Sequence, residues 1–367
     1  MSFYFDGMSR RSFLGCTTGA LLAGSLPSFG LAAPTAANPR RIILDVDTGV
    51  DDAIAILLAL RSPELKVEAV TAVSGNVPLA FTLPNTLRMV EIAGRTDVPV
   101  AGGAAQPLLR RLVTASYVHG VNGLSGVEFP EAKLQPIAET AEQVIRRIVR
   151  SNPGEITIVG VGPLTNVALA LKAEPSFAAQ IKEIVVMGGS LTGGNITPSA
   201  EFNFYVDPEA ARIVFDSGVP VTMVGLNVTQ KVLLGEPQLG VLEAAKTPAS
   251  EAAAKILRAT LEHMHKGRGM TAKTMAMHDP LTVAHLIDPT ILTLKEYYVQ
   301  IETSGELTAG ESVAYEFSPV RHSPPMNNGG PATEPAAAEF KPNAKVAVGV
   351  DAEKFFQLLL PRLTAVG

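Results

Sequence analysis

The sequence predicts an α/β protein with a mostly parallel central sheet, flanked by helices in an open, doubly wound arrangement. From Arg41 onward, short runs rich in β-branched residues alternate with amphipathic stretches, a pattern typical of parallel sheets that are covered on both faces. We find neither an internal repeat nor a clear linker, so a single domain is expected. The chain has 367 residues, of which 47% are hydrophobic and 18% charged, an ordinary composition for a globular protein.

The elements follow in order along the chain. We predict strands at 42–46, 67–73, 98–101, 156–161, 183–187 and 221–224, and helices near 52–61, 79–94, 139–151, 164–173, 208–217 and 248–266. The C-terminal part adds a short helix at 281–286, a hairpin at 296–316, an excursion rich in Pro, Asn and Gly at 318–338, a strand at 344–350 and a helix at 351–360. Ligands of such sheets bind beyond the carboxyl ends of the strands, so the residues after each strand are the candidates for a site.

The N-terminal segment is typical of an export signal. The pair Arg10-Arg11 precedes a weakly apolar segment at 19–31 and small residues at 32–37 that suit a signal peptidase. We therefore predict a Tat-type signal peptide and cleavage region over 1–37, and a protein that is periplasmic or secreted.

No stable membrane anchor is expected, because the apolar segment at 19–31 is short and is interrupted by Gly24, Pro27 and Gly30. The single domain is expected over 38–367. The only cysteine, Cys16, lies within the predicted signal. The formal net charge is −5, and no cluster interleaves basic with aromatic residues, so a nucleic-acid partner is not expected.

Four carboxylates lie where the first predicted strand passes into the first helix: Asp45, Asp47, Asp51 and Asp52. They repel one another and would be partly desolvated at the end of a central strand, so a bound cation is the natural compensation. Ligands that are all oxygen favour a hard ion, Ca²⁺ or Mg²⁺.

Two local interpretations of this stretch are weak. An EF-hand would place Asp at its fifth position and Glu at its twelfth, where this chain has Gly49 and Ile56. A haloacid-dehalogenase-like phosphatase would use Asp45 as nucleophile and Asp47 as acid, but the chain lacks the Gly-Asp dipeptide of its later metal element. The phosphatase stays a distant alternative.

Polar residues also follow other predicted strands. Asn76 follows the second strand, His119 lies in a glycine-rich loop after the third, and the segment 162–166 follows the fourth, where the carbonyl of Val161 would be free to bind a cation. Taken singly, these are compatible with a plain turn, a surface histidine and a helix capped by its Thr or Asn.

Two further groups lie in the second half of the chain. Asn195, Glu201 and Asn203 offer amides and a carboxylate that suit sugar hydroxyls, although a polar loop explains them equally well. His278-Asp279 precedes the short helix at 281–286, where capping by the aspartate is the common explanation and metal binding the rarer one.

Together these segments resemble the nucleoside hydrolase family, often called inosine-uridine preferring, over about 41–360. Its signature Asp-x-Asp-x-Gly-x-Asp-Asp matches Asp45 to Asp52, and the other matches follow in order: Gly75-Asn76, His119-Gly120, 162–166, Met187-Gly188-Gly189, Gly194-Asn195, Glu201-Phe202-Asn203 and His278-Asp279-Pro280. Thr48 departs from the signature, in which proline is frequent, and this concerns only the rigidity of the turn.

The resemblance implies an enzyme that hydrolyses the N-glycosidic bond of ribonucleosides, giving ribose and a free nucleobase. It implies a tightly held Ca²⁺ ligated by Asp47, Asp52, Asp279 and the carbonyl oxygen of Val161. A water acidified by the ion would lose its proton to Asp47, the general base, and attack C1′.

The same resemblance implies roles around the sugar. Asp51 and Asn203 would hold the 2′- and 3′-hydroxyls, Asn195 and Glu201 the 5′-hydroxyl, and Asn76 would lie near the ribose and the water. Carboxylates at these places favour the positive charge of an oxocarbenium-like ribosyl cation.

The departing base is a poor anion and needs a proton donor. His278 is the candidate acid, with His119 as a second group on the base side, and such a donor is typically worth about 10²–10⁴-fold in rate.

Base preference and assembly stay open at this point. Family members that favour purines can sandwich the base between tryptophans, and this chain has none, which argues against strict purine specificity. Similar proteins are commonly dimers or tetramers, so a homo-oligomer is implied by analogy. A non-catalytic alternative is an exported nucleoside- or ribose-binding protein that kept the Ca²⁺ pocket, but the presence of Asp47 favours hydrolysis.

Overall fold

A computed structural model describes residues 38–174, 176–268, 273–316 and 341–366. The predicted signal at 1–37 and the predicted excursion at 318–338 lie outside the described residues. Within the described part of the chain, no helix is both long and apolar enough to cross a membrane.

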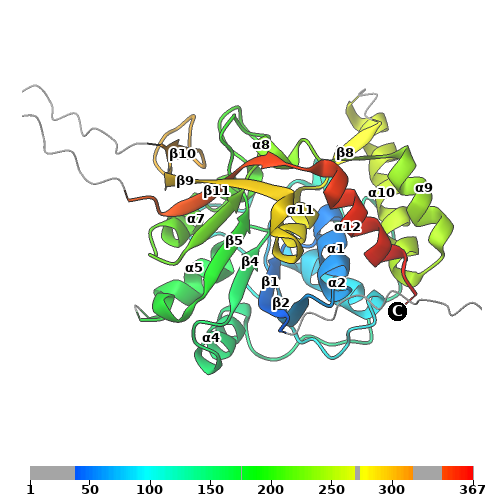
Figure 1. The fold of residues 1–367 in the computed structure, drawn as a ribbon, viewed down its shortest axis with the longest axis horizontal. Coiled ribbons are helices and arrows are strands. Elements are labelled where there is room, and N and C mark those ends of the chain that lie inside the picture. The colour runs from blue at the N-terminus through cyan, green and yellow to red at the C-terminus, as the bar shows by residue number, and fades with distance from the viewer. Residues whose placement is uncertain (1–37, 175, 269–272, 317–340, 367) are drawn as a thin grey trace, which may run out of the picture. The chain divides into compact units, whose positions relative to one another are not determined.

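The fold is organised around a nine-stranded sheet with the order β10-β9-β11-β6-β5-β4-β1-β2-β3 (Figure 1). Its strands are β1 (Arg40–Val46), β2 (Leu65–Ala72), β3 (Val100–Gly102), β4 (Thr157–Gly160), β5 (Glu183–Met187), β6 (Val221–Val224), β9 (Leu292–Ile301), β10 (Ser312–Tyr315) and β11 (Ala344–Val350). The strands from β3 across to β11 are parallel, whereas β9 is antiparallel to β11 and β10 to β9. The predicted mostly parallel sheet and C-terminal hairpin are therefore confirmed.

Helices cover both faces of the sheet. One face carries α1 (Val50–Leu60), α2 (Leu79–Ile92), α10 (Pro248–Arg268), α11 (His278–Ile287) and α12 (Ala352–Thr364), and the other carries α4 (Ala141–Ser151), α5 (Thr165–Lys172) and α7 (Pro208–Phe215). Strand β1 shows why both faces are covered. Its side chains at Ile42, Leu44 and Val46 enter one core and Ile43 enters the other, and all four are fully buried.

Several short elements lack a strong sequence signal. They are α3 (Ser116–His119), α6 (Phe202–Val206), α8 (Leu226–Thr229), α9 (Glu236–Ala245), two 3₁₀ turns at Ala178–Gln180 and Pro289–Ile291, and a separate two-stranded sheet of β7 (Leu233–Gly235) and β8 (Thr274–Ala276). The helices of four or five residues in this group are too short for helical periodicity to reveal them, whereas α9, with ten residues, was missed despite its length.

The order of the strands locates the site. After β1 the chain adds β2 and β3 on one side, and then returns to place β4 on the other side of β1. This change of direction leaves a crevice beyond the carboxyl ends of the central strands. The acidic stretch follows β1 and thus lies at that crevice.

Candidate active site

The first turn of α1 is built around the carboxylate of Asp52. One carboxylate oxygen accepts a hydrogen bond from the backbone N–H of Asp47 (3.0 Å), and the other accepts from the backbone N–H of Gly49 (2.9 Å). The side-chain amide of Asn76, which follows β2, donates a third bond to this carboxylate at 3.0 Å. Asp52 is fully buried, so these donors fix the turn and join it to the loop after β2.

The carboxylate of Asp47 lies beneath this turn and is only half satisfied. Its Oδ2 accepts a 2.6 Å hydrogen bond from the backbone N–H of Asn76. Its Oδ1 is buried and has no hydrogen-bond partner among the described residues. A Cβ at Gly75 or at Gly162 would overlap this carboxylate, so the two glycines let the loops after β2 and β4 close over it.

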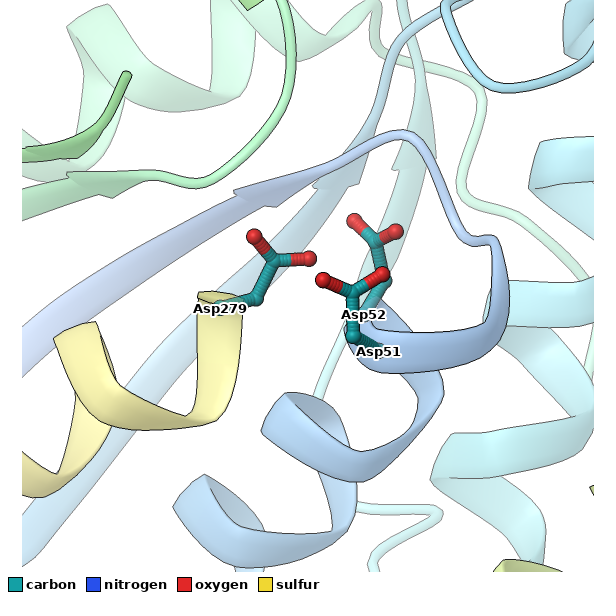
Figure 2. A group of neighbouring side chains, drawn as sticks. All are labelled: Asp51, Asp52 and Asp279. Carbon is teal, nitrogen blue, oxygen red and sulfur yellow. The ribbon is translucent and has the colours of Figure 1, made fainter. Parts of the chain in front are cut away.

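Asp51, Asp52 and Asp279 bring one carboxylate oxygen each within 4.8 Å of one another (Figure 2). Burial raises the pKa of Asp279 well above its usual range, and the charges of Asp51, Asp52, Asp47 and Glu201 raise it further. Burial, followed by the charge of Asp51, raises the pKa of Asp52 to about 7. The carboxylates are thus costly to ionise together, and a divalent cation between them would remove that cost. The donor set and the unpartnered Asp47 Oδ1 fit such an ion.

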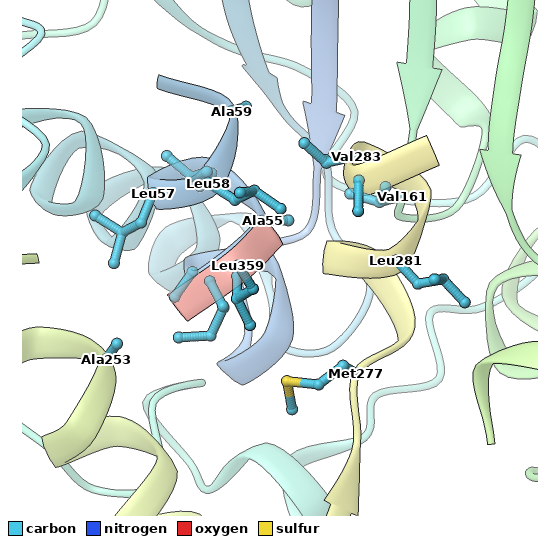
Figure 3. Close-up of a cluster of buried hydrophobic side chains, with 14 of the residues drawn as sticks. Ala55, Leu57, Leu58, Ala59, Val161, Ala253, Met277, Leu281, Val283 and Leu359 are labelled. Atoms are coloured by element: carbon cyan, nitrogen blue, oxygen red, sulfur yellow. The ribbon is translucent and has the colours of Figure 1, made fainter. Parts of the chain in front are cut away.

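Packing between α1 and α11 holds the aspartates of these two helices together. Side chains from both helices and from α12 belong to one buried apolar core (Figure 3), among them Ala55 and Leu58 of α1, Leu281 and Val283 of α11, and Leu359 of α12. The carboxylates therefore lie at the end of a close-packed core, and the ends of the two helices cannot separate without disturbing it.

Helix α11 starts earlier than the sequence predicts. It begins at His278 with Met277 at its N-cap, because Pro280 is tolerated in a first turn, where its missing N–H costs nothing. The expected start at 281 and the capping role of Asp279 are therefore wrong. Asp279 lies inside the first turn, and its carboxylate faces α1 (Figure 2).

Asp45 has a separate environment on the other side of the strand. Its Oδ1 accepts hydrogen bonds from Thr71 Oγ1 at 2.5 Å and from Asn166 Nδ2 at 2.8 Å. Burial raises its pKa to about 7. The predicted capping of α5 by Thr165 or Asn166 is wrong, because Leu164 occupies the N-cap and Asn166 instead binds Asp45. Asp45 supports the end of β1.

Asn203 joins the ends of two strands at the cavity wall. Its Nδ2 donates to the carbonyl oxygen of Val161 at 2.8 Å and to that of Met187 at 3.1 Å. Because an amide side chain has its acceptor opposite its donor, these bonds fix the position of Oδ1. A carbonyl oxygen has two lone pairs, so Val161 can accept from Asn203 and still bind a cation.

Glu201 and Asn195 are held by backbone N–H groups. The buried Glu201 carboxylate accepts from Gly189 at 3.1 Å and from Phe204 at 3.1 Å, as well as from the backbone of Asn203 at 2.9 Å. Burial nevertheless raises its pKa to about 7. Asn195 Oδ1 accepts from the backbone N–H of Phe202 at 2.9 Å, which orients its amide.

Two histidines occupy another part of the cavity wall. The backbone N–H of Val50 donates to His119 Nδ1 at 3.1 Å, and His278 Nδ1 lies 2.7 Å from Thr229 Oγ1. Burial lowers the pKa of both imidazoles, which favours their neutral form.

A cavity of about 330 Å³ unites these groups, a size in the range of small-molecule sites. Its lining contains the predicted residues Asp51, Asn76, His119, Val161, Asn195, Glu201, Asn203, His278 and Asp279. Asp47 and Asp52 are fully buried and do not belong to the lining. Gln230, Thr260, Thr274 and Met275 also line the cavity and were not predicted from the sequence.

The profile of the family described as inosine-uridine preferring nucleoside hydrolase matches residues 42–357. The chain belongs to this family. Members of the family depend on a metal ion, and the carboxylates of Asp51, Asp52 and Asp279 form a candidate site for one. The predicted family and the predicted enzyme class, a ribonucleoside hydrolase, are therefore confirmed. The phosphatase and the non-catalytic binding protein, the two alternatives, are not supported.

Relatives of this nucleoside hydrolase resemble it over almost their full length. The pyrimidine-specific ribonucleoside hydrolase RihA of Salmonella paratyphi A is 44% identical over 323 residues, covering 88% of this chain and 97% of the relative. The protein of the same name from Citrobacter koseri is 43% identical with the same coverage. Among solved structures, a plant nucleoside hydrolase has a TM-score of 0.81 at 34% identity, covering 90% of this chain and all of that one. A purine-preferring ribonucleoside hydrolase from Gardnerella vaginalis has a TM-score of 0.78 at 31% identity, with coverages of 88% and 98%.

Thr48, the departure of this nucleoside hydrolase from the family signature, has a role of its own. Its hydroxyl lies 2.6 Å from the hydroxyl of Thr86 in α2, and both side chains are fully buried. This hydrogen bond restrains the acidic turn by a tertiary contact, in place of the fixed φ that a proline would provide.

Proposed function

We propose that this nucleoside hydrolase cleaves the N-glycosidic bond of pyrimidine ribonucleosides to give ribose and the free base, and that its resident ion is Ca²⁺. One observation carries the proposal: a single cavity is lined by Asp51 and Asp279, which form an acidic cluster with the buried Asp52, and by His119 and His278. The carboxylates stabilise the positive charge that develops on the sugar in the transition state, and the histidines can donate hydrogen bonds to the departing base.

Pyrimidine preference rests on two facts. Relatives at 43–44% identity are named pyrimidine-specific, and the chain has no tryptophan to sandwich a purine. The purine-preferring relative is less similar, at 31% identity.

Asp52 and Asp279 of this cluster would hold the ion together with Asp47, whose Oδ1 has no hydrogen-bond partner among the described residues, and with the carbonyl oxygen of Val161. Asp51, the third member of the cluster, is left for the sugar, and the four oxygen ligands match the hard-ligand preference of Ca²⁺. When bound, the ion supplies positive charge that acidifies a water molecule. Asp47 takes the proton of the attacking water, since its Oδ1 has no other hydrogen-bond partner among the described residues.

The remaining residues position the substrate. Asp51 and Asn203 bind the 2′- and 3′-hydroxyls, Asn195 and Glu201 bind the 5′-hydroxyl, and Asn76 orients Asp47 through its backbone N–H. As the bond from C1′ to the base nitrogen breaks, its electron pair passes to the base. A ring N–H of His278 donates a hydrogen bond to the departing base, with His119 as the second donor. Over the whole reaction, the proton that the attacking water loses balances the proton that the free base gains.

The test of the reaction is a reducing-sugar assay on uridine, cytidine, inosine and adenosine. We expect ribose release from uridine and cytidine, with kcat/KM at least about 10-fold above the purine values, a discrimination of about 1.4 kcal/mol. Preference for inosine would overturn the pyrimidine assignment, and release of ribose from no nucleoside would overturn the reaction.

The role of Asp47 is tested by D47N, with D45N as the matched control. Both aspartates are fully buried on the same segment, and each has one unpartnered oxygen among the described residues. We expect D47N to lower kcat for uridine by about 10²–10⁴-fold and D45N to change it by less than about 10-fold. Equal losses would contradict the assignment of Asp47 as base.

We also propose that the protein acts outside the cytoplasm as a homo-oligomer, after Tat export and removal of 1–37. The support is the pair Arg10-Arg11 with the small residues at 32–37. Mass analysis of the N-terminus of the native protein tests this, and a mature protein that retains Arg10 would refute cleavage. Sedimentation measures the assembly, where a monomer at micromolar concentration would refute it.

A further inference from the structure

Thr229, the last residue of α8, contacts a histidine of the cavity. Its hydroxyl oxygen lies 2.7 Å from Nδ1 of His278, which is 49 positions away and opens α11. Thr229 is fully buried. Neither the sequence motifs nor the reaction described above uses this threonine.

The direction of this hydrogen bond follows from the needs of the hydroxyl. A buried O–H group requires an acceptor, since without one it has lost its hydrogen bond to water and gained none in the protein. Other helical threonines, such as Thr86 and Thr260, donate to the carbonyl four residues earlier. Among the described residues, Thr229 Oγ1 has only His278 Nδ1 as a partner. Thr229 therefore donates, and His278 Nδ1 accepts.

The position of the ring proton follows. A neutral imidazole has one N–H and one acceptor nitrogen, so an accepting Nδ1 places the proton on Nε2. His119 reaches the same form by another route, because the backbone N–H of Val50 can only donate to its Nδ1. Both imidazoles of the cavity wall thus have an N–H donor at Nε2.

We propose that Thr229 is a positioning residue that fixes His278 as the Nε2–H tautomer and thereby directs an N–H donor at the departing base. The catalytic consequence rests on the proposed function, whereas the tautomer does not. A nucleobase has an acceptor atom beside its glycosidic nitrogen, and a hydrogen bond there stabilises the electron pair that the base receives. The opposite tautomer would present a lone pair to this acceptor and repel it.

The variants T229V and T229S test this proposal. Valine has the shape of threonine without its hydroxyl, and serine restores the hydroxyl. Long-range ¹H–¹⁵N correlation spectra of histidine-labelled protein at pH 8 report which ring nitrogen has the proton, and H278Q assigns the signals. We expect Nε2–H for His278 in the wild type and in T229S, and loss of that single tautomer in T229V. His119 is the internal control and should stay Nε2–H throughout, since a backbone group fixes it.

Kinetics with Ca²⁺-saturated protein give the second readout. We expect T229V to lower kcat for uridine by about 10–100-fold with little change in KM, to retain nearly full activity on an activated nitrophenyl riboside, and T229S to recover most of the loss. Thermal unfolding of each variant confirms that it is folded.

The outcomes separate the role of Thr229 in fixing the tautomer of His278 from the effect of that tautomer on the departing base. An Nδ1–H tautomer for His278 in the wild type, or an unchanged Nε2–H tautomer in T229V, overturns the role of Thr229 whether or not the protein hydrolyses nucleosides. Equal loss on uridine and on the nitrophenyl riboside overturns the link to the departing base. If no nucleoside is hydrolysed while the tautomers change as expected, the proposed function fails and the role of Thr229 in fixing the tautomer is supported.

Discussion

Replacing Asn203 by aspartate separates its scaffold role from its role toward the sugar. The change keeps an acceptor oxygen but removes both N–H donors, which bind the carbonyl oxygens of Val161 and Met187 at 2.8 and 3.1 Å. Each buried acceptor that loses its donor costs about 1–3 kcal/mol. The free energy of unfolding of N203D should therefore fall by about 2–6 kcal/mol in metal-free protein at pH 8.

N195D is the matched control for N203D. Asn195 is exposed, and its interaction with the backbone N–H of Phe202 uses Oδ1, which aspartate retains. We expect N195D to change the free energy of unfolding by less than about 0.5 kcal/mol. Urea unfolding curves with equal m-values measure both changes. If the free energy of unfolding falls by less than about 1 kcal/mol in N203D, or by equal amounts in the two variants, the hydrogen bonds of Asn203 do not hold the two strand ends together.

Two further predictions use the crowding and the burial at the site. A Cβ at Gly49 would lie 2.8 Å from Asn76 Nδ2 and against His119 Nδ1, so G49A should lower kcat at least about 10-fold, and unchanged activity would contradict the geometry. In G240A the new Cβ meets open space in α9, and this control variant should be more stable than the wild type by about 0.5–1 kcal/mol. For Glu201, the pKa is raised from 4.5 to about 7, so the folded protein holds a proton that the unfolded chain has lost, and stability declines as pH rises through this window. E201Q lacks this decline. In urea titrations of metal-free protein, its free energy of unfolding relative to that of the wild type should rise by about 3 kcal/mol between pH 4.5 and pH 8. If the difference between the two proteins does not change with pH, the raised pKa of Glu201 is contradicted.

The parts of the site that could be predicted are those marked by a local pattern in the sequence. Asp45, Asp47, Asp51 and Asp52 are neighbours in the sequence, and their mutual repulsion indicates a cation without any knowledge of the fold. Alternation of strands and helices then predicts that residues after the parallel strands meet at one edge. Asn76 fits this expectation, since it reaches the acidic turn with both its backbone N–H and its amide.

The parts that could not be predicted depend on tertiary packing. Gln230 directly follows the short helix α8 and Thr260 lies within α10, and no local pattern distinguishes either from a solvated polar position. The start of α11 was misplaced because proline at position 280 is compatible both with a loop before the helix and with its first turn. The short distance between Thr229 and His278 likewise depends on how α8 packs against α11, which the sequence of either segment does not specify.

The most direct test of the central claim is uridine hydrolysis by chelated, metal-free protein during stepwise addition of Ca²⁺, with calorimetry on the same sample. The carboxylate cluster and the unpartnered Asp47 Oδ1 predict that chelation lowers kcat by at least about 100-fold, and that activity returns in proportion to one Ca²⁺ bound per chain. Full activity in protein shown to be free of metal would contradict the account, as would Ca²⁺ binding that restores no hydrolysis.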